Sequence, residues 1–223
     1  MKKTIENEIQ RISELIENSD ITSFNRINES SLSRIWNFSK NYDVAIISAS
    51  RNMAVDCVST DGKELDEEGK KYTREENQKR TRELKAYLLN KGYGVTNVIG
   101  TWIENFQTDN KIEVSESSLF VVNRSNSPDF FKIIKSLGIY YCQDAVLLKP
   151  KGEDAVLYGT NLSWPFLGNV EPAGKFNAGL ESQYMTKVGG RPFTFVEDYG
   201  PTARFLIDKY SKKLDSNLKL INN

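Results

Sequence analysis

The chain has 223 residues, with 30 basic and 30 acidic side chains and no histidine. Its formal net charge of zero gives no general electrostatic argument for binding nucleic acid or an anionic membrane. The lack of imidazole excludes Ser-His-Asp and Cys-His catalysis and histidine-based zinc sites, because each needs that ring as base or ligand. Any chemistry must therefore come from carboxylates, arginines, hydroxyls, amides and aromatic rings, and we expect neither a metal nor a cofactor.

The cysteines and the start of the chain indicate the compartment. Cys57 and Cys142 lack CxxC spacing, so we expect two free thiols in a reducing environment. No run of about 18 apolar residues occurs, and the opening "MKKTIENEIQRISELIE" is charged where a signal peptide would be apolar. We therefore expect a protein that is cytoplasmic, or packaged from a cytoplasm, without a membrane role.

The first forty residues read as a helical extension. Ile5, Ile9, Ile12 and Ile16 recur at helical intervals between charged residues, which predicts an amphipathic helix over 4–16 that packs on the domain or on a partner. An Asn- and Ser-rich linker follows, and then a short helix over 32–38. The apolar run "YDVAIISAS" at 42–50 predicts a buried strand that ends in polar residues.

A charged, Gly-containing insertion over 55–72 precedes the next helix. Thr73 and Glu76 have capping-box spacing, so a helix begins there and continues to about residue 90. Its buried stripe, Leu84, Tyr87 and Leu88, continues backward to Arg80 and Asn77. Two interpretations stay open: these polar residues line a site, or the helix start extends beyond the sheet into solvent.

The rest of the core alternates hairpins and one helix. Strands over 93–104 and 111–124 form a hairpin, a helix runs from Pro128 to a Gly138 cap, and strands over 142–149 and 154–160 form a second hairpin. This order predicts an α+β fold: a ferredoxin-like (split βαβ) core with an added strand, an N-terminal helix and a long C-terminal extension. We divide the chain into residues 1–40, a core at 41–160, and a C-terminal wrap at 161–223 that is irregular to residue 200 and ends in a helix.

Several polar features converge at one end of the predicted sheet. In "VIGTWIEN" Gly100, Trp102 and Glu104 share one face of a strand, and Glu116 lies on the paired strand. Because Glu104 and Glu116 flank the hairpin, we expect them in one cleft, where two carboxylates and the Trp102 ring would attract a cation. The alternative is that both glutamates are surface residues at the edge of the sheet.

The order of several short motifs resembles a known family. The segments "ISASR", "ENQKRTRELKAYLLNKGYG", "VIGTWIE", "ESSLFVV" and "CQDAVLL" are similar to small phage-encoded S-adenosylmethionine-degrading enzymes, formerly called hydrolases and now regarded as lyases, and to related small bacterial domains. The resemblance covers about residues 43–160. The insertion before the first core helix and the C-terminal wrap depart from the family pattern.

The resemblance implies a ferredoxin-like subunit of a homo-oligomer, usually a trimer, that converts S-adenosylmethionine to methylthioadenosine and homoserine lactone. The family's catalytic glutamate, in an aromatic-x-Glu motif, falls on Glu104. The substrate's own carboxylate would attack its γ-carbon while the sulfonium leaves, so the enzyme folds the substrate and excludes water. Residues that we expect to bind substrate are Ser48, Arg51, Asn77, Arg80, Gly100, Trp102, Glu116 and Gln143.

A second function stays open on the same fold. The chain could be a non-catalytic phage virion component or an interaction protein that uses the helix over 4–16 and the 161–200 segment as contact surfaces. Such a protein would form a stable assembly through its ends and would not bind the nucleoside.

Overall fold

The computed structural model describes most of the core and parts of the extensions. The described backbone comprises residues 2–17, 32–51, 57, 71–104, 112–163, 165–178, 184–188 and 191–196. Within these ranges, no side-chain description covers residues 2–4, 15–17, 32–33, 102–104, 112–114, 175–178, 184–185, 188 and 191–196. The linker expected after the first helix, most of the 55–72 insertion and the helix expected after Pro201 lie outside the described residues.

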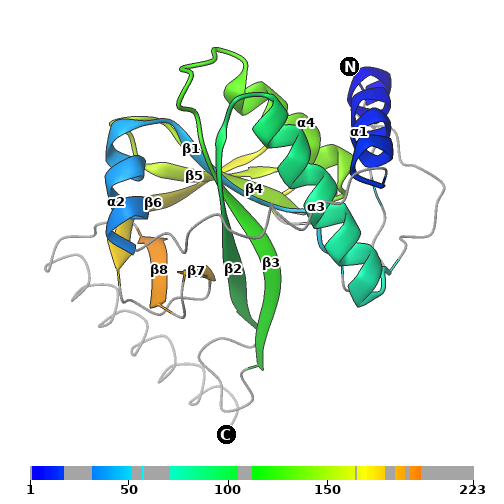
Figure 1. Ribbon diagram of the computed structural model, residues 1–223. Coiled ribbons are helices and arrows are strands. Elements are labelled where there is room, and N and C mark those ends of the chain that lie inside the picture. The colour runs from blue at the N-terminus through cyan, green and yellow to red at the C-terminus, as the bar shows by residue number, and fades with distance from the viewer. Residues whose placement is uncertain are drawn as a thin grey trace, which may run out of the picture.

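The described strands form a single antiparallel sheet that closes on itself. Its order is β1-β3-β2-β7-β8-β6-β5-β4, and β4 pairs back with β1. With the four helices this confirms the α+β class (Figure 1). The strands are β1 (Val44–Ser48), β2 (Gly94–Glu104), β3 (Ile112–Val122), β4 (Ala145–Lys149), β5 (Ala155–Gly159), β6 (Val170–Ala178), β7 (Tyr184–Val188) and β8 (Arg191–Val196).

The helices cover the two faces of this sheet unequally. The four helices are α1 (Lys2–Glu17), α2 (Leu32–Asn41), α3 (Arg74–Asn90) and α4 (Phe130–Tyr140). In Figure 1, α1, α3 and α4 gather on one side of the sheet and α2 lies across from them. The face under α1, α3 and α4 is here called the helical face, and the opposite face, against which α2 packs, the inner face.

Alternation along β1 and β3 separates two apolar clusters. Ala45, Ile47, Leu119 and Val121 belong to the cluster on the helical face, with Leu84 of α3. Val44, Ile46, Phe120 and Val122 belong to the cluster on the inner face, with Ile35 of α2. Both faces of these central strands are therefore buried, which explains why "VAIIS" reads as a continuous apolar run.

The predicted first helix packs on the chain itself. Ile5, Ile9 and Ile12 of α1 are buried in the helical-face cluster, and α1 lies against α3 and α4. Lys91 at the end of α3 forms an ion pair with Glu8, at 2.9 Å between nitrogen and oxygen. The apolar stripe of α1 is thus occupied within the chain.

Local signals place the two core helices. Thr73 caps α3: its hydroxyl accepts from the Glu76 amide at 3.2 Å, and the Glu76 carboxylate accepts from the Thr73 amide at 2.8 Å, which confirms the capping box. The predicted Gly138 cap is wrong, because Gly138 lies inside α4. A Cβ there would come within 2.8 Å of Val146 and Thr160 side-chain atoms, so glycine allows α4 to pack closely on β4.

Two expectations about the fold need correction. The prediction adds one strand to a ferredoxin-like core, whereas the described sheet continues from β5 through β6, β8 and β7 and closes; a ferredoxin-like fold as such is not confirmed. The prediction of irregular structure over 161–200 is also wrong for most of that segment, since β6, β7 and β8 lie within it. β6 and β8 were not recognised in the sequence because each contains a proline, Pro172 and Pro192, and proline argues against a strand.

The described helices were also compared with the length of a membrane span. None of them is long and apolar enough to cross a bilayer.

Candidate functional site

The inner face changes character along its central strands. On β1 and β3 the apolar residues Val44 and Val122 give way to Ser48 and Ser118, which pair with each other across the strands. Glu116 follows two residues before Ser118, on the same face. We call this end of the inner face, which comprises Ser48, Gly100, Glu116 and Ser118, the polar end.

Gly100 leaves room at the polar end. Gly100 of β2 pairs with Glu116, and a Cβ at Gly100 would lie 2.6 Å from the Ser118 hydroxyl. Any larger residue would push into the space that the Ser118 and Glu116 side chains share. The glycine in "VIGTWIE" therefore has a steric reason in the packing of this site.

Glu116 is the most perturbed carboxyl group of the described residues. Glu116 as a whole residue is only partly buried, but desolvation of its carboxyl raises the pKa of Glu116 to about 7. The Arg51 cation and a hydrogen bond with Ser48 act in the opposite direction, and Asp144 adds to the increase. Glu116 is thus poised to change charge near neutral pH, as groups at functional sites often are.

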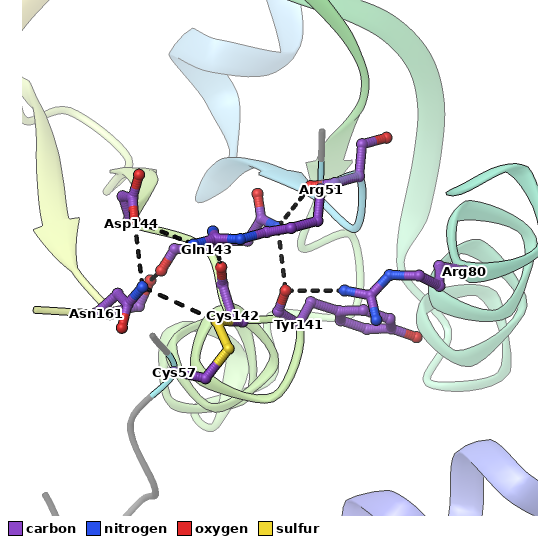
Figure 2. Close-up of polar contacts among 10 residues, drawn as sticks. Arg51, Cys57, Arg80, Tyr141, Cys142, Gln143, Asp144 and Asn161 are labelled. Carbon is purple, nitrogen blue, oxygen red and sulfur yellow. Dashed lines mark hydrogen bonds and ion pairs between the residues drawn. A yellow bond between two sulfur atoms is a disulfide. The ribbon is translucent and has the colours of Figure 1, made fainter. Parts of the chain in front are cut away.

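Four predicted binding residues meet just beyond β1, where they hold main-chain groups. Figure 2 shows three of them, Arg51, Arg80 and Gln143. Arg80 donates to the carbonyls of Ala49 and Tyr141, at 2.8 and 2.9 Å. Gln143 donates to the carbonyl of Ser50 at 3.0 Å, and Arg51 donates to that of Cys142.

Asn77 completes this arrangement from α3. Its amide oxygen accepts from the Arg51 backbone amide at 2.7 Å, and its amide nitrogen donates to the Arg51 carbonyl at 3.2 Å. We call Arg51, Asn77, Arg80 and Gln143 the carbonyl clamp. The clamp fixes the segment after β1 against the segment before β4, so the helix start is not a solvated overhang. A direct role of the clamp in substrate binding stays a prediction.

Arg51 connects the clamp electrostatically to Glu116. It is 8% exposed, and burial lowers the pKa of its guanidinium, while Asp144 and Glu116 act in the opposite direction. Its Nη2 lies 3.8 Å from Asp144 Oδ1, and Asn161 Nδ2 donates to the same oxygen at 3.2 Å. The Arg51 cation is therefore shared between two carboxylates, one on the inner face and one half-exposed.

The expectation of two free thiols is wrong. Cys57 and Cys142 form a disulfide, and no described cysteine is free. The bond joins the segment after Arg51 to the end of α4, next to the clamp (Figure 2). Spacing gave no sign of it, because the two cysteines are 85 positions apart in the chain and only the fold brings Cys57 to the end of α4.

Trp102 and Glu104 have described positions in β2, but their side chains lie outside the description. The register pairs Glu104 with Ile112 and Gly100 with Glu116, so Glu104 is not directly across from Glu116. Alternation puts positions 100, 102 and 104 on one face of β2, with positions 104 and 116 roughly 13 Å apart along the strands.

Sequence reasoning missed three residues near this site. Ser118 faces Gly100, and Asp144 and Asn161 flank Arg51. Asp144 directly precedes β4 and Asn161 follows β5, so a polar residue at each strand end was the available signal. Among the described residues, no group of three or more acidic or cysteine side chains could hold a metal ion.

A groove of about 500 Å³ runs along β2, β3 and β7. It is lined by Asn97, Val98, Ile99, Ser115, Glu116, Ser117 and Lys187. Ile99 pairs with Ser117 and Lys187, so these residues lie on the face opposite Gly100. The groove therefore opens mainly on the outside of the strands, behind the polar end.

Comparison with known proteins identifies one family. The model of the S-adenosylmethionine lyase family matches residues 68–198, which is more than half of the chain. No curated protein and no solved structure matches. The match extends from just before α3 through β8, so residues 161–198, which the sequence analysis took as part of a departure from the family, lie within the matched region.

Proposed function

Because this chain belongs to the S-adenosylmethionine lyase family, we propose that it converts S-adenosylmethionine to methylthioadenosine and homoserine lactone at the polar end of the inner face. The observation that carries the proposal is the buried Glu116 carboxyl, which lies opposite Gly100 on the strand that bears the aromatic-x-Glu motif. The part of the fold made by β4-β1-β3-β2 with α3 and α4 is, in this proposal, the ferredoxin-like subunit of the family.

The proposed reaction is a displacement within the substrate. The α-carboxylate of S-adenosylmethionine attacks its own γ-carbon, the C–S bond breaks, and the bonding electron pair leaves with the sulfur as methylthioadenosine. Lactone formation needs no external base, since the carboxylate is already ionised. The protein has to fold the chain so that the oxygen approaches the γ-carbon in line with sulfur, and to exclude water.

Negative charge at the site serves the cationic substrate. Glu104, with Trp102 two residues earlier, is proposed as the catalytic glutamate that orients the sulfonium or the ammonium group. Glu116 adds a second carboxyl that ionises more readily when a cation is bound, because a nearby positive charge lowers a carboxyl pKa. Ser48 and Arg51 hold Glu116 in place and moderate its charge.

The direct test is product formation. The purified protein is incubated with S-adenosylmethionine, and methylthioadenosine and homoserine lactone are separated by chromatography. Both products are expected from the wild type, and Glu104→Gln is expected to lower the rate at least 100-fold because the charge at the reacting centre is lost. Glu153→Gln, on an exposed turn between β4 and β5, is the matched control and retains activity. Equal rates in Glu104→Gln and the control would reject the assignment.

A homo-oligomer is part of the same proposal. Leu162 and Phe166, between β5 and β6, and Val170, the first residue of β6, are large apolar residues with exposures of 41%, 56% and 54%. Exposed apolar residues in one segment support burial against another copy. Light scattering coupled to size-exclusion chromatography gives the subunit number, and a monomer at micromolar concentration would reject this part.

The non-catalytic alternative gains no support from α1. Its apolar stripe is buried against α3 and α4 and is not available as a contact surface. Deletion of residues 1–40 would also remove Ile35 from the inner-face cluster, so loss of assembly in that variant would report unfolding.

A further inference from the structure

Cys142 makes three contacts near the site: a disulfide bond and two hydrogen bonds. Cys142 follows the end of α4, its carbonyl accepts a hydrogen bond from Arg51, and its sulfur accepts one from Asn161 Nδ2 at 3.9 Å. Its bonded partner, Cys57, is only six residues after Arg51. Arg51 and Cys57 thus both attach to Cys142, one through a hydrogen bond and one through a covalent bond.

The backbone at Cys142 depends on these attachments. Its φ is +57°, the left-handed conformation that commonly ends a helix and usually belongs to glycine. A side chain in this conformation costs roughly 1–2 kcal/mol. Two amides close the helix end, from Cys142 to Ile139 at 3.1 Å and from Gln143 to Gly138 at 2.9 Å. Cysteine therefore occupies a backbone position whose conformation favours glycine.

The two sulfurs differ in access and surroundings. Cys142 is 8% exposed, whereas Cys57 is only partly buried, so an external thiol reaches Cys57 more easily. The Asn161 amide and the nearby Arg51 cation stabilise negative charge at Cys142, although Asp144 offsets part of the Arg51 charge. A thiolate so stabilised is the better leaving group in disulfide exchange.

From this asymmetry we propose that Cys57–Cys142 is a redox-active disulfide that a dithiol reductant opens by attack on Cys57, with Cys142 as the leaving thiolate and with release of one attachment of the Arg51 segment. In the first step a reductant thiolate bonds to the Cys57 sulfur, and the S–S electron pair goes to Cys142, which takes up a proton. In the second step the other reductant thiol attacks the mixed disulfide. Cys57 leaves as a thiol, and the reductant becomes an intramolecular disulfide.

The consequence extends to the polar end of the inner face. With the disulfide open, Cys142 loses its covalent bond to the post-β1 segment and keeps the hydrogen bond from Arg51, so Arg51 gains freedom relative to Glu116. Because Arg51 is the main opposing charge felt by Glu116, the redox state would alter the charge available to a cationic ligand there. The disulfide chemistry itself does not depend on the proposed lyase activity.

The first test identifies the attacked sulfur in the wild type. Protein purified without reductant is digested under non-reducing conditions and mapped by mass spectrometry, and a linked Cys57–Cys142 peptide is expected. A brief reaction with the monothiol 2-mercaptoethanol then traps the mixed disulfide, which is expected on Cys57. Two unlinked thiols before treatment, or an adduct mainly on Cys142, would overturn the proposal.

The second test measures the leaving group. Reduction by dithiothreitol is followed by alkylation and mass analysis in Asn161→Ala and Arg51→Gln. Arg124→Gln is the control, because Arg124 is an exposed arginine that stacks on Phe38. Each unit by which the thiolate pKa increases should slow reduction about 3-fold. If Arg51→Gln does not fold by circular dichroism, Asn161→Ala decides. Rates equal to that of Arg124→Gln would contradict the assignment of Cys142.

Discussion

The inner face has two ends that the same strands build for different purposes. At one end Val44, Phe120 and Val122 are fully buried against Ile35 of α2. At the other, β1 and β3 present Ser48, Ser118 and Glu116, opposite a glycine. The apolar end gains free energy by excluding water, whereas the polar end keeps a carboxyl group buried at a cost. The apolar end thus stabilises the fold, whereas the polar end carries the group that can change charge.

Truncation at the apolar end should have the largest effect on stability. Phe120→Ala removes a fully buried ring from the inner-face cluster, and we expect the free energy of unfolding to fall by about 3–5 kcal/mol. Urea unfolding followed by circular dichroism measures this change. A loss below about 1 kcal/mol would mean that this end is not a packed core.

At the polar end, a substitution is expected to raise the free energy of unfolding instead of lowering it. The Glu116 pKa is about 7 in the folded chain and about 4.5 in a free carboxyl, so between these values the folded state holds a proton that the unfolded state has lost. The free energy of unfolding therefore decreases as pH rises from about 4.5 to 7, by up to about 3 kcal/mol. Glu116→Gln lacks this loss and should gain stability relative to wild type over that range.

Urea titrations at several pH values between 4 and 8 check this second prediction. The exposed Glu153→Gln variant serves as the control, since it changes the same formal charge without burial. Parallel pH profiles for wild type and Glu116→Gln would show that the Glu116 carboxyl is not enclosed.

The carbonyl clamp behind the polar end should contribute less. Arg80→Ala loses two charge-assisted hydrogen bonds and the stacking of the guanidinium 4.0 Å from the Tyr72 ring, so we expect a loss of about 2–3 kcal/mol. Arg82→Ala, an exposed arginine on the same helix, is the control in thermal unfolding. Equal melting temperatures would show that the clamp is dispensable.

The smallest expected effect belongs to the cap of α3. Thr73→Ala removes the hydroxyl that accepts from the Glu76 amide and should cost about 1 kcal/mol. Urea unfolding is again the measurement, and Thr73→Ser should restore most of the loss because it keeps the hydroxyl. A Thr73→Ser variant as unstable as Thr73→Ala would contradict the cap's contribution.

The sequence predicts those features of the fold that depend on neighbouring residues better than those that depend on residues far apart in the chain. The capping box at Thr73, the buried strand β1 and the β2–β3 hairpin depend on patterns of neighbouring residues, and all three are confirmed. Closure of the sheet was not predicted, because β6 and β8 each contain a proline and because the closing pair joins β7 to β2, a strand far earlier in the chain. The disulfide was missed for the same reason, since it joins residues 85 positions apart.

The sequence predicted which residues of the candidate site come together better than it predicted what they contact. Arg51, Asn77, Arg80 and Gln143 do come together, as the polar start of α3 and the ends of the strands indicated. Their partners, main-chain carbonyls on neighbouring segments, have no sequence signature. The pairing of Glu116 with Gly100 depends on hairpin register, which the turn sequence did not fix.

The most direct test is whether the substrate cation reaches the buried Glu116 carboxyl. NMR titration of ¹³C-labelled glutamate carboxyls in the Glu104→Gln variant, which should leave S-adenosylmethionine largely intact, gives the pKa of Glu116 with and without the ligand. The account predicts a pKa of about 7 without ligand and a clear decrease when the sulfonium compound is bound. The same Glu116 pKa with and without saturating S-adenosylmethionine would contradict the claim that the polar end is the substrate site.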